Sequence, residues 1–298
     1  MVKSNRKKRL PDWLTVKLDC GENYTRVRGL LSKHNLNTVC QGARCPNQWE
    51  CWNQGTATFM VLGGVCTRGC RFCGVPPIKS PSPPDPNEPA AVAKAVAELE
   101  LNWAVITSVT RDDLPDGGAG HFAACVREIT AKIPGCGVEL LIPDFGGDRE
   151  SLLTVAGSGA DVIGHNVETV PRLYTAARPE ADYKRSLDVL RTLVELGEGK
   201  YSVKSSLMIG LGETEEEIEQ ALHDIAATGC DSATLGQYLQ PSKQHLPVLR
   251  YYTPEEFERL GQSARRAGIA KVASGPRVRS SYLAHQLQGR SLRDNKTD

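Results

Sequence analysis

Two groups of three cysteines near the start of the chain have the residue type and spacing of iron–sulfur ligands. The first group follows a C-x4-C-x5-C pattern and the second a C-x3-C-x2-C pattern. Three closely spaced thiolates bind three irons of a cubane and leave the fourth iron free for another ligand. The second group therefore predicts a catalytic iron–sulfur site, and the first needs its own explanation. The six residues are Cys40, Cys45 and Cys51, then Cys66, Cys70 and Cys73.

Zinc is the main alternative metal, because soft thiolates suit zinc as well as iron–sulfur clusters. Zinc sites favour paired C-x2-C knuckles with a second pair or a histidine nearby. His34 is the histidine nearest to either group, and it lacks that paired spacing. The spacing thus favours iron–sulfur clusters. The other cysteines are scattered singly, which is typical of small buried hydrophobic residues; they are Cys20, Cys125, Cys136 and Cys230.

Composition sets the general class of the protein. The 298 residues include 40% hydrophobic and 24% charged side chains, and 36 basic against 35 acidic residues leave a net charge of +1. These values are typical of globular proteins and give no overall charge for binding nucleic acid. Clustered cysteines in a reducing compartment serve as metal ligands or in catalysis rather than as disulfides. Without an apolar run of about 18 residues, we expect a cytoplasmic protein with no membrane partner.

Short apolar runs alternate with amphipathic stretches along the rest of the chain. Glu88–Leu101 and Tyr183–Leu196 place apolar residues at helical spacing on one face. Thr214 and Thr253 are each followed three residues later by a glutamate, which is the capping-box spacing of a helix start. The six apolar runs that predict strands are Thr58–Leu62, Trp103–Ser108, Val138–Ile142, Asp161–Asn166, Tyr201–Met208 and Asp231–Gln237.

Strands that alternate with helices predict a parallel sheet, either open and doubly wound or curled into a barrel. Polar residues follow the predicted strands, among them Ser108, Asn166 and Gln237. In a barrel, residues at the strand ends gather at one rim and carry the function. We therefore predict an α/β fold, a partial (β/α)6 TIM-type barrel with N- and C-terminal extensions. We expect its open side to admit a bulky substrate.

The barrel prediction divides the chain into three parts. Residues 1–56 form an N-terminal extension with the first cysteine group, residues 57–250 form the barrel, and residues 251–298 form a C-terminal helical extension. Residues 76–89 hold seven prolines, which predicts a stiff, non-helical connection from the second cysteine group to the first barrel helix. We expect this connection to lie over the cluster.

The second cysteine group lies directly after the first predicted strand and reads Cys66-Thr-Arg-Gly-Cys70-Arg-Phe72-Cys73. This C-x3-C-x-Phe-C pattern resembles the signature of the radical S-adenosylmethionine superfamily. The resemblance implies that the open iron of a [4Fe–4S] cluster binds S-adenosylmethionine, which is cleaved to methionine and a 5′-deoxyadenosyl radical. Phe72 is then expected to shield the cluster or to pack near the adenine.

Five further residues are candidate contacts for S-adenosylmethionine. Asn166 and Glu168 follow the fourth strand and form a candidate ribose-binding pair, because an amide and a carboxylate can donate to and accept from two hydroxyls. A surface turn is the alternative for this pair. The remaining candidates are Ser108, Arg178 and Lys204.

Longer stretches of the chain resemble the lipoyl synthase family, from about residue 10 to about residue 285. The chain departs from the usual pattern at Thr110, Ala176 and Ser206, where aspartate, a basic residue and glycine are usual. The matching stretches are residues 40–52, 106–118, 165–170, 204–214 and 236–256, and the motif Gly275-Pro-Arg-Val-Arg-Ser-Ser281-Tyr.

The resemblance implies a sulfurtransferase of lipoate biosynthesis and protein lipoylation. Cys40, Cys45 and Cys51, with Ser281 as fourth ligand, would hold an auxiliary [4Fe–4S] cluster. In the family this cluster is consumed as the source of the sulfur inserted at C6 and C8 of a protein-bound octanoyl-lysine. A hard serine oxygen is a poor match beside three soft thiolates. That corner is therefore expected to release iron more easily than a fourth cysteine would.

The implied partners are octanoylated lipoyl-carrier domains, namely 2-oxo acid dehydrogenase E2 components and the glycine-cleavage H protein. An electron donor such as ferredoxin or flavodoxin and iron–sulfur assembly or carrier proteins are implied as well. The basic residues of the N-terminus are either a docking element for an acidic carrier or a solvated tail; they are Lys3, Arg6, Lys7, Lys8 and Arg9.

Two other functions compete with this prediction. One is a different two-cluster radical enzyme, such as a methylthiotransferase, which would lack the Ser281 motif. The other is a non-catalytic electron carrier or a zinc-stabilised interaction protein. The metal content and the production of 5′-deoxyadenosine distinguish these alternatives.

Overall fold

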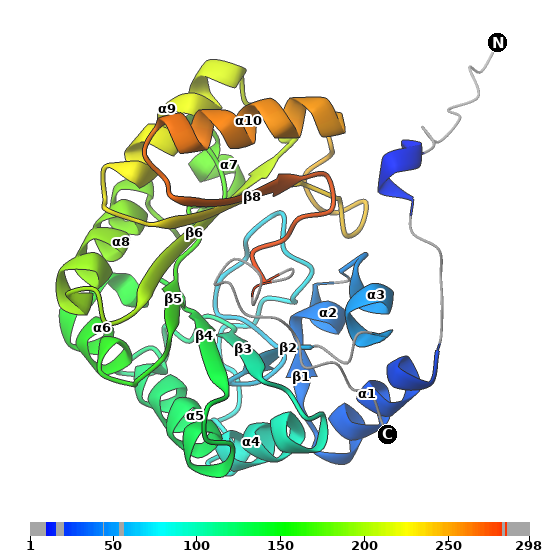
Figure 1. Cartoon of the computed structure of the whole chain (residues 1–298), viewed down its shortest axis with the longest axis vertical. Coiled ribbons are helices and arrows are strands. Elements are labelled where there is room, and N and C mark those ends of the chain that lie inside the picture. Colours follow the sequence, from blue (N-terminus) through cyan, green and yellow to red (C-terminus); the bar gives the residue numbers. More distant parts are fainter. Residues whose placement is uncertain (1–9, 16–20, 44, 54–56, 282–283, 285–298) are drawn as a thin grey trace.

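A computed structural model describes residues 10–15, 21–43, 45–53, 57–281 and 284 of the chain. Its eight strands form a single sheet in chain order, in which β1 is antiparallel to β2 and every later pair is parallel. The sheet curls around a central space but keeps two edges, β1 and β8 (Figure 1). The strands are β1 (Asn37–Thr38), β2 (Thr58–Val61), β3 (Trp103–Ser108), β4 (Gly137–Leu141), β5 (Val162–Gly164), β6 (Ser202–Ile209), β7 (Ser232–Gln237) and β8 (Lys271–Gly275).

Helices follow strands β2 to β7 in six consecutive βα units and cover the outside of the sheet (Figure 1). This confirms the predicted α/β fold with six units in an open barrel. The covering helices are α4 (Glu88–Glu98), α5 (Ala119–Lys132), α6 (Arg149–Ala156), α8 (Tyr183–Gly197), α9 (Glu215–Ala226) and α10 (Pro254–Arg266). Shorter elements are η2 (Phe145–Gly147), η3 (Pro171–Leu173) and α7 (Tyr174–Ala177).

The predicted capping boxes at the starts of α9 and α10 are confirmed. In both helices the threonine side chain accepts from a backbone N–H in the first turn, and the glutamate side chain accepts from the threonine N–H. Pro254 follows its cap at the first helical position, where a missing N–H has no intrahelical role. The buried faces carry apolar residues at helical spacing, such as Ile218, Leu222 and Ile225 of α9.

Strand β8 was not among the six strands predicted from the sequence. It pairs in parallel with β7, with Gly236 opposite Gly275, and it extends the sheet past the sixth helix. Its five residues are all partly exposed and include Lys271, so they do not form the apolar run that marks the other strands. The chain boundaries at residues 56 and 250 stay predictions.

The N-terminal segment lies beside the first edge of the sheet. It contains η1 (Asp12–Leu14), α1 (Glu22–Lys33), α2 (Val39–Gly42) and α3 (Gln48–Asn53). Tyr24 of α1 stacks on Trp49 of α3 with ring centroids 4.6 Å apart. In Figure 1, α2 and α3 lie on the side of the barrel between β1 and β8, where the sheet is open. Entry of a bulky substrate through that side stays a prediction.

The two faces of each strand have different partners, because successive side chains point to opposite sides of the sheet. In β3, Ala104 and Ile106 belong to the main core. Trp103 and Val105 instead pack with Val162 of β5 and with Ala284. The segment after β8 therefore turns into the barrel, as the red trace in Figure 1 shows.

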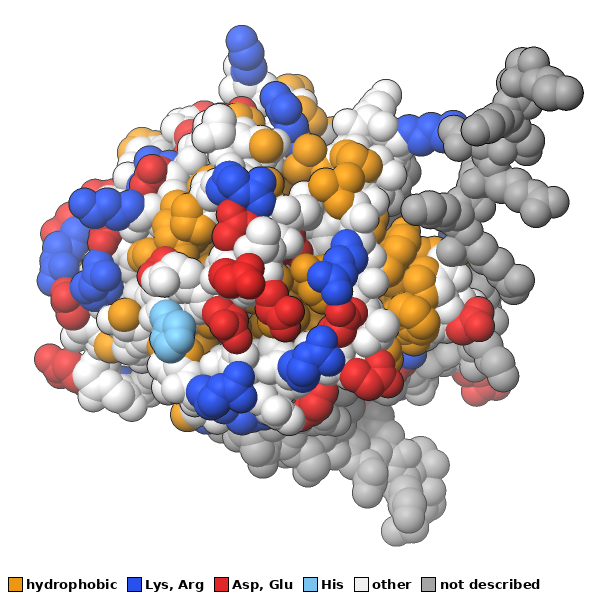
Figure 2. All heavy atoms as spheres, turned by 90° about the horizontal axis from the view of Figure 1, so that it is seen from above, with side chains coloured by type: hydrophobic (Ala, Val, Ile, Leu, Met, Phe, Trp, Pro, Cys, Tyr) orange, Lys and Arg blue, Asp and Glu red, His pale blue; other side chains and the backbone are white. Residues whose placement is uncertain are grey.

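The surface of the described chain carries charges of both signs. Figure 2 shows acidic and basic side chains interspersed over the face that is uppermost in Figure 1, where α9 and α10 lie. Among the described residues, no helix has the length and apolar character needed to cross a membrane. The basic N-terminal residues and Cys20 lie outside the described residues.

Candidate active site

Both cysteine groups line one cavity of about 470 Å³ within the barrel. The wall includes Ser108, Met208 and Gln237, which lie at or next to the carboxyl ends of β3, β6 and β7. This is the rim at which barrels of this type carry their function. Ser281 also lines the cavity, together with all six clustered cysteines and the predicted residues Phe72, Ser108, Asn166, Glu168 and Arg178.

The loop after β2 presents the second cysteine group to the cavity. The backbone N–H groups of Arg68 and Thr110 donate to Cys66 Sγ at 3.4 and 3.3 Å. The proline-rich connection begins as a short ladder against Cys66, whose N–H donates to the Pro76 carbonyl and whose carbonyl accepts from Ile78.

Arg68 fixes this loop to the ends of two neighbouring strands. Its guanidinium forms a bidentate pair with Asp112, at 2.6 and 2.8 Å, and donates to Asp144 at 2.9 Å. Arg185 donates to the same buried Asp144 at 2.9 Å. Burial alone would raise the pKa of Asp144, but the hydrogen bonds and charge of Arg68 hold it well below its usual range. Asp144 is therefore ionised at neutral pH.

The loop after β7 contacts the other end of the same cysteine group. His245 Nε2 lies 2.8 Å from the Cys73 carbonyl oxygen, and the Leu246 N–H donates to the Arg71 carbonyl at 3.0 Å. The Tyr238 hydroxyl in turn donates to the Leu246 carbonyl at 2.8 Å. The second cysteine group is thus held from two sides by strand-end loops.

Ser108 Oγ and Arg178 Nε are among the polar atoms of the cavity wall that are buried without a hydrogen-bond partner in the described residues. Buried polar groups are normally hydrogen-bonded, so a polar ligand in the cavity would satisfy both. Asn166 donates to the Glu168 carboxylate at 3.0 Å, and burial raises the pKa of Glu168. Glu168 also adopts a positive φ of 72°, a strained conformation that occurs often at functional sites. These residues fit the polar groups of S-adenosylmethionine.

Lys204 is the predicted cofactor contact that the structure does not bring to the cavity wall. It lies near the start of β6, and its ammonium pairs with the Glu139 carboxylate of β4 at 2.6 Å. Both side chains are about 3% exposed, so each neutralises the other inside the barrel. The sequence did not indicate this ion pair, because its two residues come from strands that are not adjacent: β5 lies between β4 and β6.

The first cysteine group lies on the N-terminal helices. Cys40 belongs to α2, Cys51 to α3, and Cys45 to the turn between them. Burial raises the pKa of Cys40 to about 11, and an N–H donated by the Thr58 backbone opposes this shift. Burial likewise raises the pKa of Cys73 to about 12. Both thiols therefore hold their protons until a metal replaces them.

Ser281 reaches this group through the segment that follows β8, residues 276–281, called here the C-terminal arm. Asn47 Nδ2 donates to the Arg277 carbonyl at 2.6 Å, and the Arg277 guanidinium pairs with Glu50. Gly236 of β7 admits the arm, because a Cβ at this position would lie 2.0 Å from the Val278 carbonyl oxygen. These contacts are set by tertiary structure, and no pattern in the sequence indicates them.

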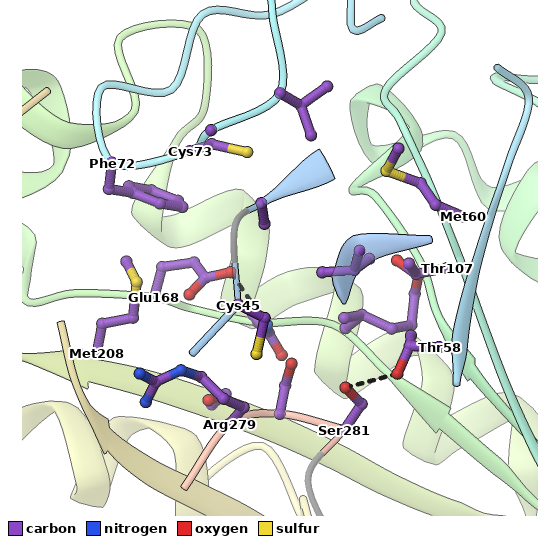
Figure 3. Close-up of a pocket in the computed structure, with 18 of the residues that line it drawn as sticks. Cys45, Thr58, Met60, Phe72, Cys73, Thr107, Glu168, Met208, Arg279 and Ser281 are labelled. Atoms are coloured by element: carbon purple, nitrogen blue, oxygen red, sulfur yellow. Dashed lines mark hydrogen bonds between the residues drawn. The ribbon is translucent and has the colours of Figure 1, made fainter. Parts of the chain in front are cut away.

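The end of the arm contacts the first cysteine group and β2. The Thr58 hydroxyl donates to Ser281 Oγ at 3.0 Å, and Figure 3 shows the two side chains joined at the cavity wall. Arg279 lies nearby in the same view. Burial lowers the pKa of Arg279, and the neighbouring Cys45 opposes this shift.

The thiols of both groups are free, with no disulfide among the described cysteines. No three His, Cys, Asp or Glu side chains in the described part of the chain converge to hold a single metal ion. A cubane binds one cysteine at each of several irons, so its ligands surround a larger volume than one ion does. Two groups of free thiols around a shared cavity therefore fit two clusters.

The open six-unit barrel and its thiol-lined cavity define a radical S-adenosylmethionine enzyme, and residues 60–225 match the model of that superfamily. Residues 1–45 match the N-terminal domain of lipoyl synthase of the same family. The chain belongs to the lipoyl synthase family. It is 51% identical to lipoyl synthase of Chlorobaculum tepidum over 93% of this chain and 95% of the relative. It is 52% identical to lipoyl synthase of Methylococcus capsulatus over 93% and 86%.

Solved structures of low sequence identity share the fold. The FeFe-hydrogenase maturase HydG from Carboxydothermus hydrogenoformans has a TM-score of 0.57 at 13% identity, over 72% of this chain and 52% of that one. Methylornithine synthase has a TM-score of 0.50 at 15% identity, over 86% of this chain and 82% of that one. These similarities show the fold alone.

Proposed function

We propose that this chain inserts two sulfur atoms at C6 and C8 of an octanoyl group that is amide-linked to a lysine of a carrier protein. One observation carries the proposal: both cysteine groups and Ser281 line the same cavity. A radical made at one group and a sulfur source held at the other would then share one substrate space. The family membership and the lipoyl synthase N-terminal domain support the same reaction.

Cys66, Cys70 and Cys73 are the proposed ligands of the reducing [4Fe–4S] cluster. Together with S-adenosylmethionine, the bound cluster supplies hydrogen abstraction from unactivated carbon. Ser108 and Arg178 offer unpartnered polar atoms to the cofactor, and the side chains of Asn166 and Glu168 offer an amide and a carboxylate. Phe72 contributes an apolar wall that excludes water. These residues bind and orient; the cofactor carries the radical chemistry.

Cys40, Cys45, Cys51 and Ser281 are the proposed ligands of the auxiliary [4Fe–4S] cluster, which is a substrate because its sulfide enters the product. The serine oxygen is a hard ligand beside three soft thiolates, so its iron is held least well. Ser281, which would hold that iron, lines the cavity together with the three cysteines. Arg279 lies near Cys45 in the cavity wall.

The family acts on lipoyl carrier proteins. We propose that the carriers are E2 components of 2-oxo acid dehydrogenases and the glycine-cleavage H protein. Ferredoxin or flavodoxin would supply electrons, and iron–sulfur assembly or carrier proteins would restore the auxiliary cluster. We place the enzyme in the cytoplasm, because six cysteines that serve as cluster ligands need a compartment that keeps thiols reduced.

An assay with an octanoylated peptide tests the proposed function. Anaerobically reconstituted enzyme should contain about eight irons per chain, and with reductant and S-adenosylmethionine it should produce 5′-deoxyadenosine. The peptide mass should change by two sulfur atoms gained and two hydrogens lost. A peptide of unchanged mass, or zinc in place of iron, would refute the proposal.

Matched cysteine variants assign the two sites. Cys51→Ala should leave about four irons per chain, and it should still cleave S-adenosylmethionine without forming lipoyl product. Cys125→Ala removes a buried free thiol of α5 that does not line the cavity, so it should keep the full iron content and activity. Equal iron loss in both variants would show that the loss reflects misfolding.

A further inference from the structure

Thr58 contacts Ser281, one of the proposed auxiliary-cluster ligands. It is the first residue of β2, it lines the cavity, and it is 8% exposed. Its side-chain hydroxyl donates to Ser281 Oγ at 3.0 Å. Nothing in its sequence context marks Thr58 as functional.

Thr58 is more firmly placed than its partner. Its strand is paired on both sides, antiparallel to β1 and parallel to β3, with Thr58 itself opposite Val105. A β-branched side chain in a strand has few χ1 rotamers, so the direction of the hydroxyl is restricted. Ser281, in contrast, lies at the end of an arm that is itself neither strand nor helix. The hydrogen bond therefore fixes the position of Ser281 relative to the sheet.

The chemistry of the pair sets the direction of the hydrogen bond. A serine oxygen that binds iron has lost its proton and can only accept, so its partner must donate, as the Thr58 hydroxyl does. A hydrogen bond to a charged oxygen is roughly twice as strong as one between neutral groups. Ser281 is the partner observed for the Thr58 hydroxyl among the described residues.

We infer that Thr58 is a positioning residue for Ser281: its hydroxyl donates to Ser281 Oγ and orients that oxygen toward the auxiliary cluster. The inference rests on the proposed function, in which Ser281 binds the iron that is lost first. Removal of the hydroxyl should leave the cluster with three cysteine ligands and a loosely held serine. That iron should then leave before sulfur is needed.

The test measures iron release from the holoenzyme rather than product alone. Thr58→Val keeps the branched shape of the side chain but removes the hydroxyl donor. With excess chelator and saturating S-adenosylmethionine, it should lose its first iron at least about tenfold faster than wild type, the scale of ligand-orienting contacts. After mild oxidation it should show the electron paramagnetic resonance signal of a three-iron cluster. Thr58→Ser should restore slow release.

A double variant separates positioning from general packing. If Thr58 acts through Ser281, then Thr58→Val should add nothing to the release rate of Ser281→Ala. Thr107→Val is the matched control, because it removes another cavity-wall hydroxyl, which donates to the Leu141 carbonyl at 2.8 Å. It should release iron at the wild-type rate.

Several outcomes would overturn the inference. They are a wild-type release rate in Thr58→Val, equally fast release in Thr107→Val, and additive rates in the double variant. If Thr58→Val does not fold, Thr58→Ser and Thr58→Ala differ only in the hydroxyl oxygen and give the same comparison. A wild-type enzyme that releases iron slowly but never modifies the octanoyl peptide would refute the proposed function and leave the Thr58 result intact.

Discussion

Gly236→Ala should disable sulfur insertion while leaving radical formation intact. Gly236 lies in β7, and an added Cβ would stand 2.0 Å from the Val278 carbonyl oxygen of the C-terminal arm. Real Cβ contacts are essentially never shorter than 3.0 Å, so the arm must retreat by about 1 Å. Ser281 follows Val278 by three residues and would move with it.

The size of the effect follows from this displacement. A functional group must be held within about 0.5 Å of its productive position, and a misplacement of about 1 Å costs on the order of 100-fold in rate. We therefore expect lipoyl formation to fall about 100-fold. The strained contact should also lower the free energy of unfolding by about 1–3 kcal/mol.

The assay compares two products of one reaction mixture. Lipoyl peptide should fall, whereas 5′-deoxyadenosine should stay near the wild-type amount, because Cys66, Cys70 and Cys73 lie on a different loop. Gly29→Ala is the control: Gly29 is exposed in α1 with no atom within 4 Å of the added Cβ, so activity should be unchanged. Wild-type lipoyl formation by Gly236→Ala would refute the role of the arm.

Three further variants test other parts of the site. Arg68→Met leaves buried Asp144 with one cation fewer, so calorimetry should show a loss of about 3 kcal/mol in unfolding free energy; unchanged stability would contradict this. Burial lowers the pKa of His165 from 6.5 to about 4. The neutral, buried histidine therefore contributes about 3 kcal/mol to the free energy of unfolding above pH 6.5, and this contribution is lost as the pH falls toward 4. Urea unfolding at pH 7 and 4.5 should show that loss in wild type, and an equal loss in His165→Gln would exclude His165 as its source. Ser281→Cys should keep about eight irons per chain but lose lipoyl formation. A wild-type yield of lipoyl peptide would refute the idea that the hard serine oxygen makes its iron easier to lose.

Local patterns in the sequence predicted those parts of the fold that local physics determines. Six apolar runs became strands, and the capping boxes at Thr214 and Thr253 started helices. Strand β8 was missed because its half-exposed residues have no apolar pattern and depend on β7 for their conformation. A strand at the sheet edge takes its structure from its neighbour more than from its own composition.

In the candidate site, too, local sequence patterns predicted some residues and missed others. The cysteine spacing and the strand-end polar residues placed most predicted groups at one cavity. Lys204 did not join them, because its side chain pairs with the buried Glu139 of β4, the next strand but one in the sheet. The contacts of Thr58 and Gly236 with the C-terminal arm join residues far apart in the chain. Such pairs leave no trace in local spacing, so a single sequence cannot indicate them.

The position of the arm also has a consequence for the order of biosynthesis. A ribosome that has reached Gly275 has completed every strand of the sheet, yet the chain still lacks Ser281. At about 5–20 residues per second, tens of seconds separate the synthesis of Cys51 from that of Ser281. The proposed auxiliary cluster would therefore have its full ligand set only after every strand of the sheet has been synthesised. A chain that ended before Ser281 would contain all six clustered cysteines but would lack the proposed serine ligand of the auxiliary cluster.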